Sequence, residues 1–326
     1  MPRTEFNPLA IFKRENDRSL GSDAAKLLEN PFVLLMVVGG LLAVATVFAK
    51  AAPAVGWHPL ALLQWSVLGG AGALFAVTSM FGARKDTEDR KSAPGWKGRM
   101  MLYLTVSGLL FIAPNMIAVV AASKVGAGFV ALSYAFPLVL TYGFAVFLRL
   151  ERFQIVRAAG VVFGLAGGLL LALSGAKLSG EASLWSLIAM AIPVFLAVGN
   201  IYRTVQWPEN ARPVDLALGM MLVGFLGLAV FNGLMGIPER PLVWNREAVG
   251  LLAAQIVVFT LQYGLYFRLQ KTAGPVYLSQ IGSVAAVTGL GLGYLVFSEV
   301  PGLGQLMAVL AVGAGIVLVT LGRRRL

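Results

Sequence analysis

The chain has 326 residues, of which 58% are hydrophobic and only 13% are charged. A soluble domain carries about 25% charged residues, so this composition predicts a polytopic membrane protein. The net charge of +11 does not point to nucleic acid, because the basic residues lie in short segments between apolar stretches. The lack of cysteine excludes disulfides, thiolate metal sites and cysteine nucleophiles.

Residues 1–30 are polar and of mixed charge, and we expect them to form a cytoplasmic tail. After this tail come ten apolar stretches, each long enough to cross a bilayer as a helix of roughly 20 residues. The sequence therefore predicts an all-α polytopic membrane protein with short connections and no soluble domain. The predicted spans cover residues 31–51, 59–81, 100–122, 127–148, 155–174, 184–205, 213–236, 247–268, 274–298 and 303–322.

The distribution of basic residues predicts the orientation of these spans. Of the 26 Lys and Arg residues, 21 lie in alternate segments that begin with the N-terminal tail. By the positive-inside rule, both termini are cytoplasmic, residues 86–97 lie inside and residues 177–181 lie outside. The five basic residues in the other segments are Lys50, Lys124, Lys177, Arg240 and Arg246.

A partial internal repeat relates the two halves of the chain. Residues 124–151 are weakly similar in sequence to the residues 148 positions further on. In this alignment Gly126 matches Gly274 and Glu151 matches Glu299. The identities gain weight because they fall in register with the apolar stretches. Internal repeats of this kind indicate a repeated architecture.

The repeat predicts two bundles of five helices, over residues 31–174 and 184–322. Five is an odd number of spans, so the second bundle must enter the membrane in the opposite direction. Inverted repeats are typical of secondary transporters, which bind their substrate between the two halves near the middle of the bilayer.

Polar residues inside the spans are the candidates for a substrate path. In the eighth span, Gln255, Phe259, Gln262, Tyr263 and Tyr266 share one helix face by their spacing. Amides and phenols are costly against lipid, so this face is predicted to look inward. The alternative is that such groups only hydrogen-bond neighbouring helices. The predicted substrate-binding residues are Gln255, Gln262, Tyr263, Tyr266, Gln280, Ser283, Asn200, Tyr202, Asn115, Tyr134, Gln64, Trp65 and Thr46.

The charged residues limit the chemistry that the spans can perform. None of the 15 acidic residues lies in the middle of a predicted span, so paired carboxylates for acid–base catalysis are missing. The single histidine, His58, has no inward acid beside it, which argues against a metal site. We therefore predict no catalytic residue, no metal and no cofactor, and we do not expect an enzyme.

Two basic residues lie at the ends of spans. Lys50 ends the first span and Arg203 lies near the end of the sixth. We expect both side chains to reach toward the lipid headgroups, as most such residues do. An alternative places Lys50 at the outer mouth of the cavity, where it would attract a carboxylate.

Several motifs resemble the EamA-type permeases of the drug/metabolite transporter superfamily. Residues 132–151 run into the sequence LRLERF before a glycine-rich fifth span, and Glu299 precedes a second glycine-rich span. Residues 199–208 look like the branch of that superfamily that exports aromatic amino acids. The resemblance implies an export role. It also implies a cavity framed by spans one to four and six to nine, with spans five and ten outside.

Together these features predict a secondary transporter that exports small amphipathic metabolites by alternating access, with aromatic and other neutral amino acids preferred. The alternatives are a carrier for phosphorylated metabolites, a broad-specificity drug exporter and a channel. Phosphate would call for an inward basic residue, and the first span lacks the Glu that related small multidrug exporters use. The predicted setting is the inner (plasma) membrane of a bacterium, as a monomer or homodimer, with lipid and a small-molecule substrate as partners.

Overall fold

The structure is a computed structural model that describes residues 30–81, 96–149, 152–176 and 180–323. Within these ranges the chain is helical and contains no strand. The predicted N-terminal tail, most of the predicted inner loop 86–97, and Glu151 lie outside the described residues. The helices are α2 (Pro31–Ala51), η1 (Ala52–Val55), α3 (Pro59–Phe81), α4 (Trp96–Val125), α5 (Ala127–Ser133), α6 (Pro137–Phe147), α7 (Ile155–Ala176), α8 (Glu181–Ala189), α9 (Ile192–Val205), α10 (Pro213–Met235), α11 (Arg246–Leu278), α12 (Ile281–Phe297) and α13 (Leu303–Arg323).

Helix length and composition support an integral membrane protein. Among the described residues, seven helical segments are long and apolar enough to cross a bilayer. Three shorter apolar helices accompany them, Ile155–Leu171, Ile281–Phe297 and Leu303–Leu318. Every stretch predicted as a span is helical in the structure, while the number of full crossings stays a prediction.

Three of the predicted spans are interrupted within their length. The fourth divides into α5 and α6 before Pro137, and the sixth divides into α8 and α9 before Pro193. The ninth is broken at residues 279–280, between α11 and α12. Proline lacks an N–H and fits the first turn of a helix, so it begins the new segment in the first two cases. Such breaks are tolerated at membrane depth when protein surrounds them.

The pair of glycines matched by the internal repeat forms two sharp corners. Gly126 has φ of 96° between α4 and α5, and Gly274 has φ of 76° inside α11. This left-handed backbone conformation favours glycine. Helix resumes directly after the corner at Gly274. As a result, α11 contains both the eighth predicted span and the start of the ninth, which we predicted as separate helices. The two-repeat organisation itself stays a prediction.

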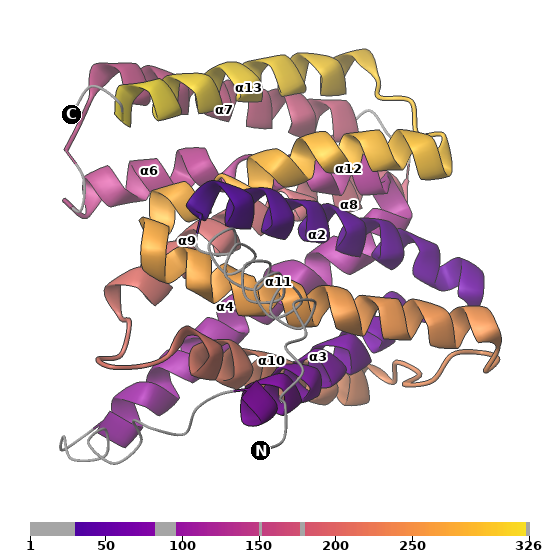
Figure 1. Ribbon diagram of the computed structural model, residues 1–326. Coiled ribbons are helices and arrows are strands. Elements are labelled where there is room, and N and C mark those ends of the chain that lie inside the picture. Colours follow the sequence, from indigo (N-terminus) through magenta and orange to yellow (C-terminus); the bar gives the residue numbers. More distant parts are fainter. Residues whose placement is uncertain (1–29, 82–95, 150–151, 177–179, 324–326) are drawn as a thin grey trace, which may run out of the picture.

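Helices from the two halves of the chain pack against one another (Figure 1). The first-half helix α2 lies beside α11 and α12, and α4 lies beside α8, α9 and α10. Helices α7 and α13 pair along one edge of the bundle. There a Cβ atom on Gly167 would lie 2.7 Å from Val312, and one on Gly315 would lie 2.7 Å from the carbonyl oxygen of Gly160. Small residues therefore allow these two helices to approach closely.

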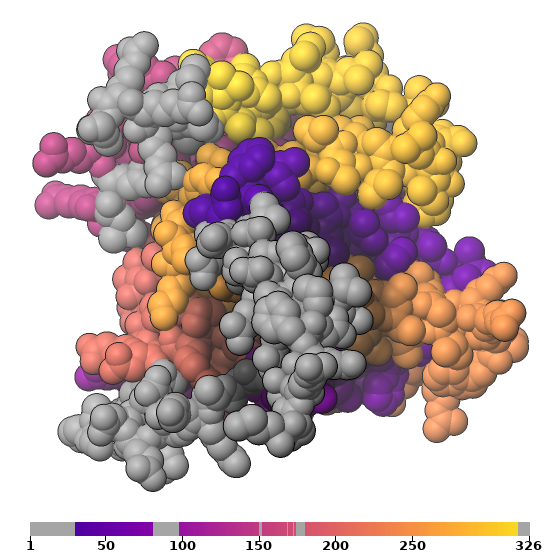
Figure 2. Space-filling view, in the orientation of Figure 1, coloured from indigo at the N-terminus to yellow at the C-terminus, as the bar shows by residue number. Residues whose placement is uncertain are grey.

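Apolar side chains cover the outside of the bundle, and polar ones gather inside it. In the space-filling view, α12 and α13 form one continuous surface above α2 (Figure 2). The exposed side chains on these and other helices include Leu165, Leu169, Val230, Leu306 and Leu310. The buried polar side chains include Gln64, Asn200, Arg203, Asn232, Gln255 and Gln262. This arrangement suits a lipid environment, since hydrocarbon solvates the exterior and leaves polar groups to pair within.

Candidate functional site

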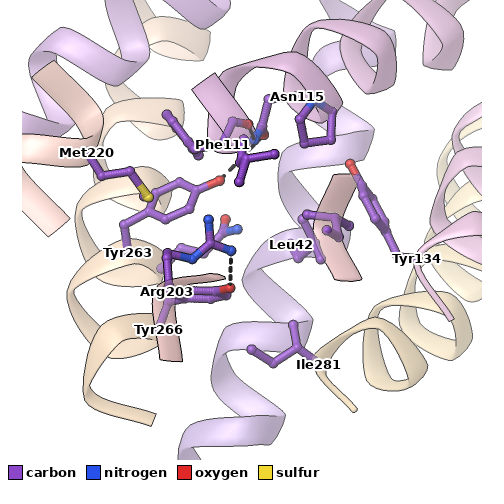
Figure 3. Close-up of a pocket in the computed structure, with 13 residues that line it drawn as sticks. Leu42, Phe111, Asn115, Tyr134, Arg203, Met220, Tyr263, Tyr266 and Ile281 are labelled. Carbon is purple, nitrogen blue, oxygen red and sulfur yellow. Dashed lines mark hydrogen bonds between the residues drawn. The ribbon is translucent and has the colours of Figure 1, made fainter. Parts of the chain in front are cut away.

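A small cavity lies at the centre of the bundle, between helices of both halves (Figure 3). Its main part has a volume of about 50 Å³, and an adjoining part of about 10 Å³ shares Leu42, Asn115, Tyr134 and Gln262 with it. We call these two parts the central cavity. Its described walls come from α2, α4, α9, α10, α11, α12 and the turn between α5 and α6. The described parts of α3, α7 and α13 do not line it.

One face of α11 forms the longest wall of the central cavity. Gln262, Tyr263 and Tyr266 line the main part, and Gln255, Phe259 and Gln262 line the adjoining part. Their helical spacing puts them on one stripe, which the surrounding helices shield from lipid. The structure therefore brings together the residues that the sequence pattern placed on a single face.

Aromatic rings make up the apolar part of this wall. Tyr263 is 5% exposed and packs edge-on against Phe111 of α4, with ring centroids 4.8 Å apart. It also contacts Phe259 at 5.3 Å and Tyr266 at 6.2 Å. Its hydroxyl donates to Oδ1 of Asn115 across the cavity, at 3.4 Å. Stacked and edge-on rings of this kind offer a surface for a flat apolar group.

Arg203 lies in the cavity wall with only 2% of its surface exposed. Figure 3 shows its guanidinium group between Tyr263 and Tyr266. Nη2 donates to the Tyr266 hydroxyl at 2.8 Å and to Oδ1 of Asn200 at 3.1 Å, while Nε and Nη1 have no hydrogen-bond partner. No described carboxylate pairs with it. A Cβ atom on Gly199 would lie 3.0 Å from both terminal nitrogens, so this glycine makes room for the guanidinium.

The expectation that Arg203 reaches the headgroups is wrong. In an α-helix the side chains lean toward the N-terminus, and α9 is predicted to run from the outside to the cytoplasm. A long side chain near the end of α9 therefore leans back toward the middle of the bundle. The spacing of Gly199 and Arg203, one helical turn apart, is the sequence signal that could have shown this.

Lys50 also differs from expectation, since it is paired with an acid at the end of the bundle that we predict to be outside. Its Nζ bonds Glu299, whose carboxylate also accepts from the backbone N–H groups of Ala127 and Gly128 at 3.0 and 2.9 Å. Burial on its own would raise the pKa of Glu299, but the bonds from Lys50, Gly128 and Ala127 outweigh it and lower the pKa. We call this group of four residues the Glu299 clamp. It joins the end of α12 to the start of α5 and to α2.

Some predicted site residues lie at or just behind the cavity wall. Thr46 lines the adjoining part of the cavity. Asn200 does not line the cavity itself but hydrogen-bonds a residue that does. It accepts from the Tyr266 hydroxyl at 2.6 Å and donates to Ser279 at 3.1 Å. Gln280 and Ser283 flank the cavity residue Ile281 at the start of α12, but they do not line the cavity themselves.

Three predicted residues lie away from the central cavity. Gln64 accepts from Nδ2 of Asn232 at 2.7 Å, between α3 and α10. The Trp65 indole donates to the carbonyl of Glu239 at 2.7 Å. Tyr202 stacks on Tyr103 at 5.9 Å instead of facing inward. Residues two positions apart on a helix point about 200° apart, so Asn200 and Tyr202 could not share a face.

The central cavity is smaller than the pockets that usually bind small molecules. Pockets that bind small molecules have volumes of about 300–1,000 Å³, whereas the central cavity offers about 50 Å³. Such a space holds only water. An amphipathic ligand could enter only if helices on one side of the cavity moved apart.

The sequence and the fold were compared with known protein families and structures, and the family match agrees with the predicted transporter. Residues 181–321 match the family model described as the EamA-like transporter family. A search of curated proteins gives no match. Among 28 matching chains of solved structures, one crystal structure is 22% identical, covers 93% of this chain and 99% of its own, and has a TM-score of 0.60. At this identity the likeness shows the fold alone. The family match, which covers the second half of the chain, supports the drug/metabolite transporter superfamily and suggests a membrane transporter of small molecules.

Proposed function

We propose that this protein is a secondary transporter that exports small amphipathic metabolites, with aromatic and other neutral amino acids as the preferred class. It works by alternating access across the inner membrane of a bacterium, with both termini in the cytoplasm. The observation that carries this proposal is the central cavity, because aromatic rings and a few buried polar groups from both halves converge there. Binding sites of transporters lie at such an interface between repeats.

The apolar and polar parts of the cavity match the two parts of an amphipathic ligand. Phe111, Tyr263 and Tyr266 offer ring surface, while Asn115 and Gln262 offer amide groups. Burial of an aromatic side chain against such rings would supply most of the binding free energy. The amides would fix the polar end of the ligand and so provide specificity.

The two main alternatives fit the cavity less well. A phosphate group carries about two negative charges and is bound by clusters of basic groups, whereas Arg203 is the one basic residue among the described lining residues. A cationic drug would call for an acid, and the described lining contains none. Both alternatives remain outcomes of the test below.

The test is transport by the purified protein in liposomes, measured by counterflow with a panel of labelled compounds. The panel holds aromatic, aliphatic and charged amino acids, sugar phosphates and a quaternary ammonium drug. We expect exchange of aromatic and neutral amino acids at rates well above those of protein-free liposomes. Exchange of the sugar phosphates or the drug alone would contradict the proposal.

A further inference from the structure

We infer that the central cavity is built for a zwitterion, with Arg203 holding the carboxylate of the substrate and the carbonyl oxygen of Gln262 accepting from its ammonium group. This inference rests on the proposed function and narrows it. The substrate class is an α-amino acid with both charged groups free, rather than an amine, a simple carboxylate or a phosphate ester.

Arg203 supplies the positive half of the site. Its charge is permanent, because a guanidinium stays protonated in proteins. Its described partners are neutral, the Tyr266 hydroxyl and the Asn200 amide, and its Nε and Nη1 are unsatisfied. A buried cation without a counter-ion is costly inside a membrane protein. A carboxylate in the cavity would remove that cost through charge-assisted hydrogen bonds.

Two glutamines line the central cavity with unsatisfied acceptors, and Gln262 is the one that shares its main part with Arg203. Gln262 is 3% exposed and Gln255 is 2% exposed. The side-chain oxygen Oε1 of each is buried and has no hydrogen-bond partner. Both side chains line the central cavity. An ammonium group has three donors and no acceptor, so it can satisfy such carbonyl oxygens without leaving an acceptor of its own unpaired.

The two halves of the site are close enough for one small ligand. Gln262 and Tyr266 are four residues apart on α11, which places their Cβ atoms roughly 6 Å apart on one face. Tyr266 in turn holds the guanidinium of Arg203. The carboxylate and the ammonium of an α-amino acid are joined through a single carbon, which suits two groups that line the same small part of the cavity. Tyr263 and Phe111 line the same part of the cavity as Arg203 and Gln262, and they would contact the side chain of the amino acid.

The experiment compares four ligands that differ only in their charged groups. Binding of L-phenylalanine, L-phenylalaninamide, 3-phenylpropionate and 2-phenylethylamine is measured by calorimetry on the purified protein in detergent. We expect Arg203→Gln to weaken the two carboxylate-bearing ligands on the order of 10- to 100-fold. The other two ligands are cations, so their binding should stay the same or strengthen once the positive charge is gone. Gln262→Leu should weaken the three amine-bearing ligands about 10-fold and spare 3-phenylpropionate.

Two further variants separate a binding role from a structural one. Arg203→Lys keeps the charge and should retain part of the carboxylate preference. Arg157 of α7 is the matched control, since it is equally buried at 3% exposure but lies over the Tyr142 ring, away from the central cavity. Arg157→Gln should leave the ranking of the four ligands unchanged, with affinities calculated per folded molecule.

The outcomes distinguish this inference from the proposed function. Equal weakening of all four ligands by Arg203→Gln, or no weakening of any, would overturn the inference even if the wild-type protein transports phenylalanine. Failure of all four ligands to bind, together with no amino acid transport, would overturn both. Binding of sugar phosphates that depends on Arg203, without binding of phenylalanine, would show that Arg203 serves a different anion and would also refute the zwitterion site.

Discussion

Buried glutamines of this bundle fall into two kinds that the sequence does not separate. Gln64 is paired with Asn232 across a helix contact, whereas Gln255 faces the central cavity with an unsatisfied carbonyl oxygen. Both lie in apolar spans, and each is 2% exposed. Helical spacing placed Gln255 correctly on the cavity face because four neighbours share its stripe. Gln64 had no such partners in its own span, so its direction could not be deduced.

This difference predicts opposite effects of the same substitution. Gln255→Leu removes an unpaired polar group of similar volume, so thermal stability should stay the same or rise while transport per folded molecule falls several-fold. Gln64→Leu removes the oxygen to which Nδ2 of Asn232 donates at 2.7 Å. The loss of this buried hydrogen bond should lower the free energy of unfolding by about 1–3 kcal/mol. Transport per folded molecule should then be nearly unchanged. Melting curves and counterflow rates on both variants check this, and parallel losses in the two would refute the assignment.

At the scale of helices, the positions of the segments follow from hydropathy, but their interruptions do not. Pro137 and Pro193 mark two breaks in the sequence, and glycine at 126 and 274 marks the corners. The break at residues 279–280 has no proline within it. The role of Glu299 was equally hidden, because its three partners come from α2 and the start of α5, far away in the sequence.

The Glu299 clamp predicts a dependence of stability on pH. The pKa of Glu299 is lowered in the folded protein from an ordinary value of 4.5. Its contribution to stability is therefore fully present above pH ~4.5 and is lost as the pH falls through the lower, folded-state pKa. Glu299→Gln should lower the melting temperature at pH 7, and its deficit relative to wild type should shrink as the pH falls below 4.5.

A second glutamate provides the control for this prediction. Glu181 also pairs with a lysine, Lys124, at 2.9 Å, but its side chain is 63% exposed. Exposed ion pairs contribute little to stability. Glu181→Gln should therefore leave the melting curve unchanged at pH 7 and at pH 3.5. A deficit for Glu299→Gln that is the same at pH 7 and pH 3.5 would contradict the account of the clamp.

At the scale of the whole molecule, composition and hydropathy sufficed to predict a helical membrane protein. The apolar exterior and buried polar groups agree with that prediction. Three-dimensional packing was needed to find the charge at the centre. Arg203 lies near the predicted end of a span, and only the lean of its side chain along α9 brings it to Tyr266 and Asn200.

Alternating access would open the central cavity to each side of the membrane in turn. Substituted-cysteine labelling can detect this opening, because the chain has no cysteine of its own. Leu42 lines both parts of the cavity, while Leu165 on α7 is 53% exposed on the outside of the bundle. Impermeant thiol reagents are applied to Leu42→Cys and Leu165→Cys in liposomes, from each side in turn, with and without the best amino acid of the panel. The account predicts that Leu42→Cys reacts from both sides, that the amino acid slows the reaction, and that the labelled protein stops transporting, whereas Leu165→Cys shows none of these effects. A Leu42→Cys protein whose labelling rate ignores the amino acid, and which transports normally once labelled, would contradict it.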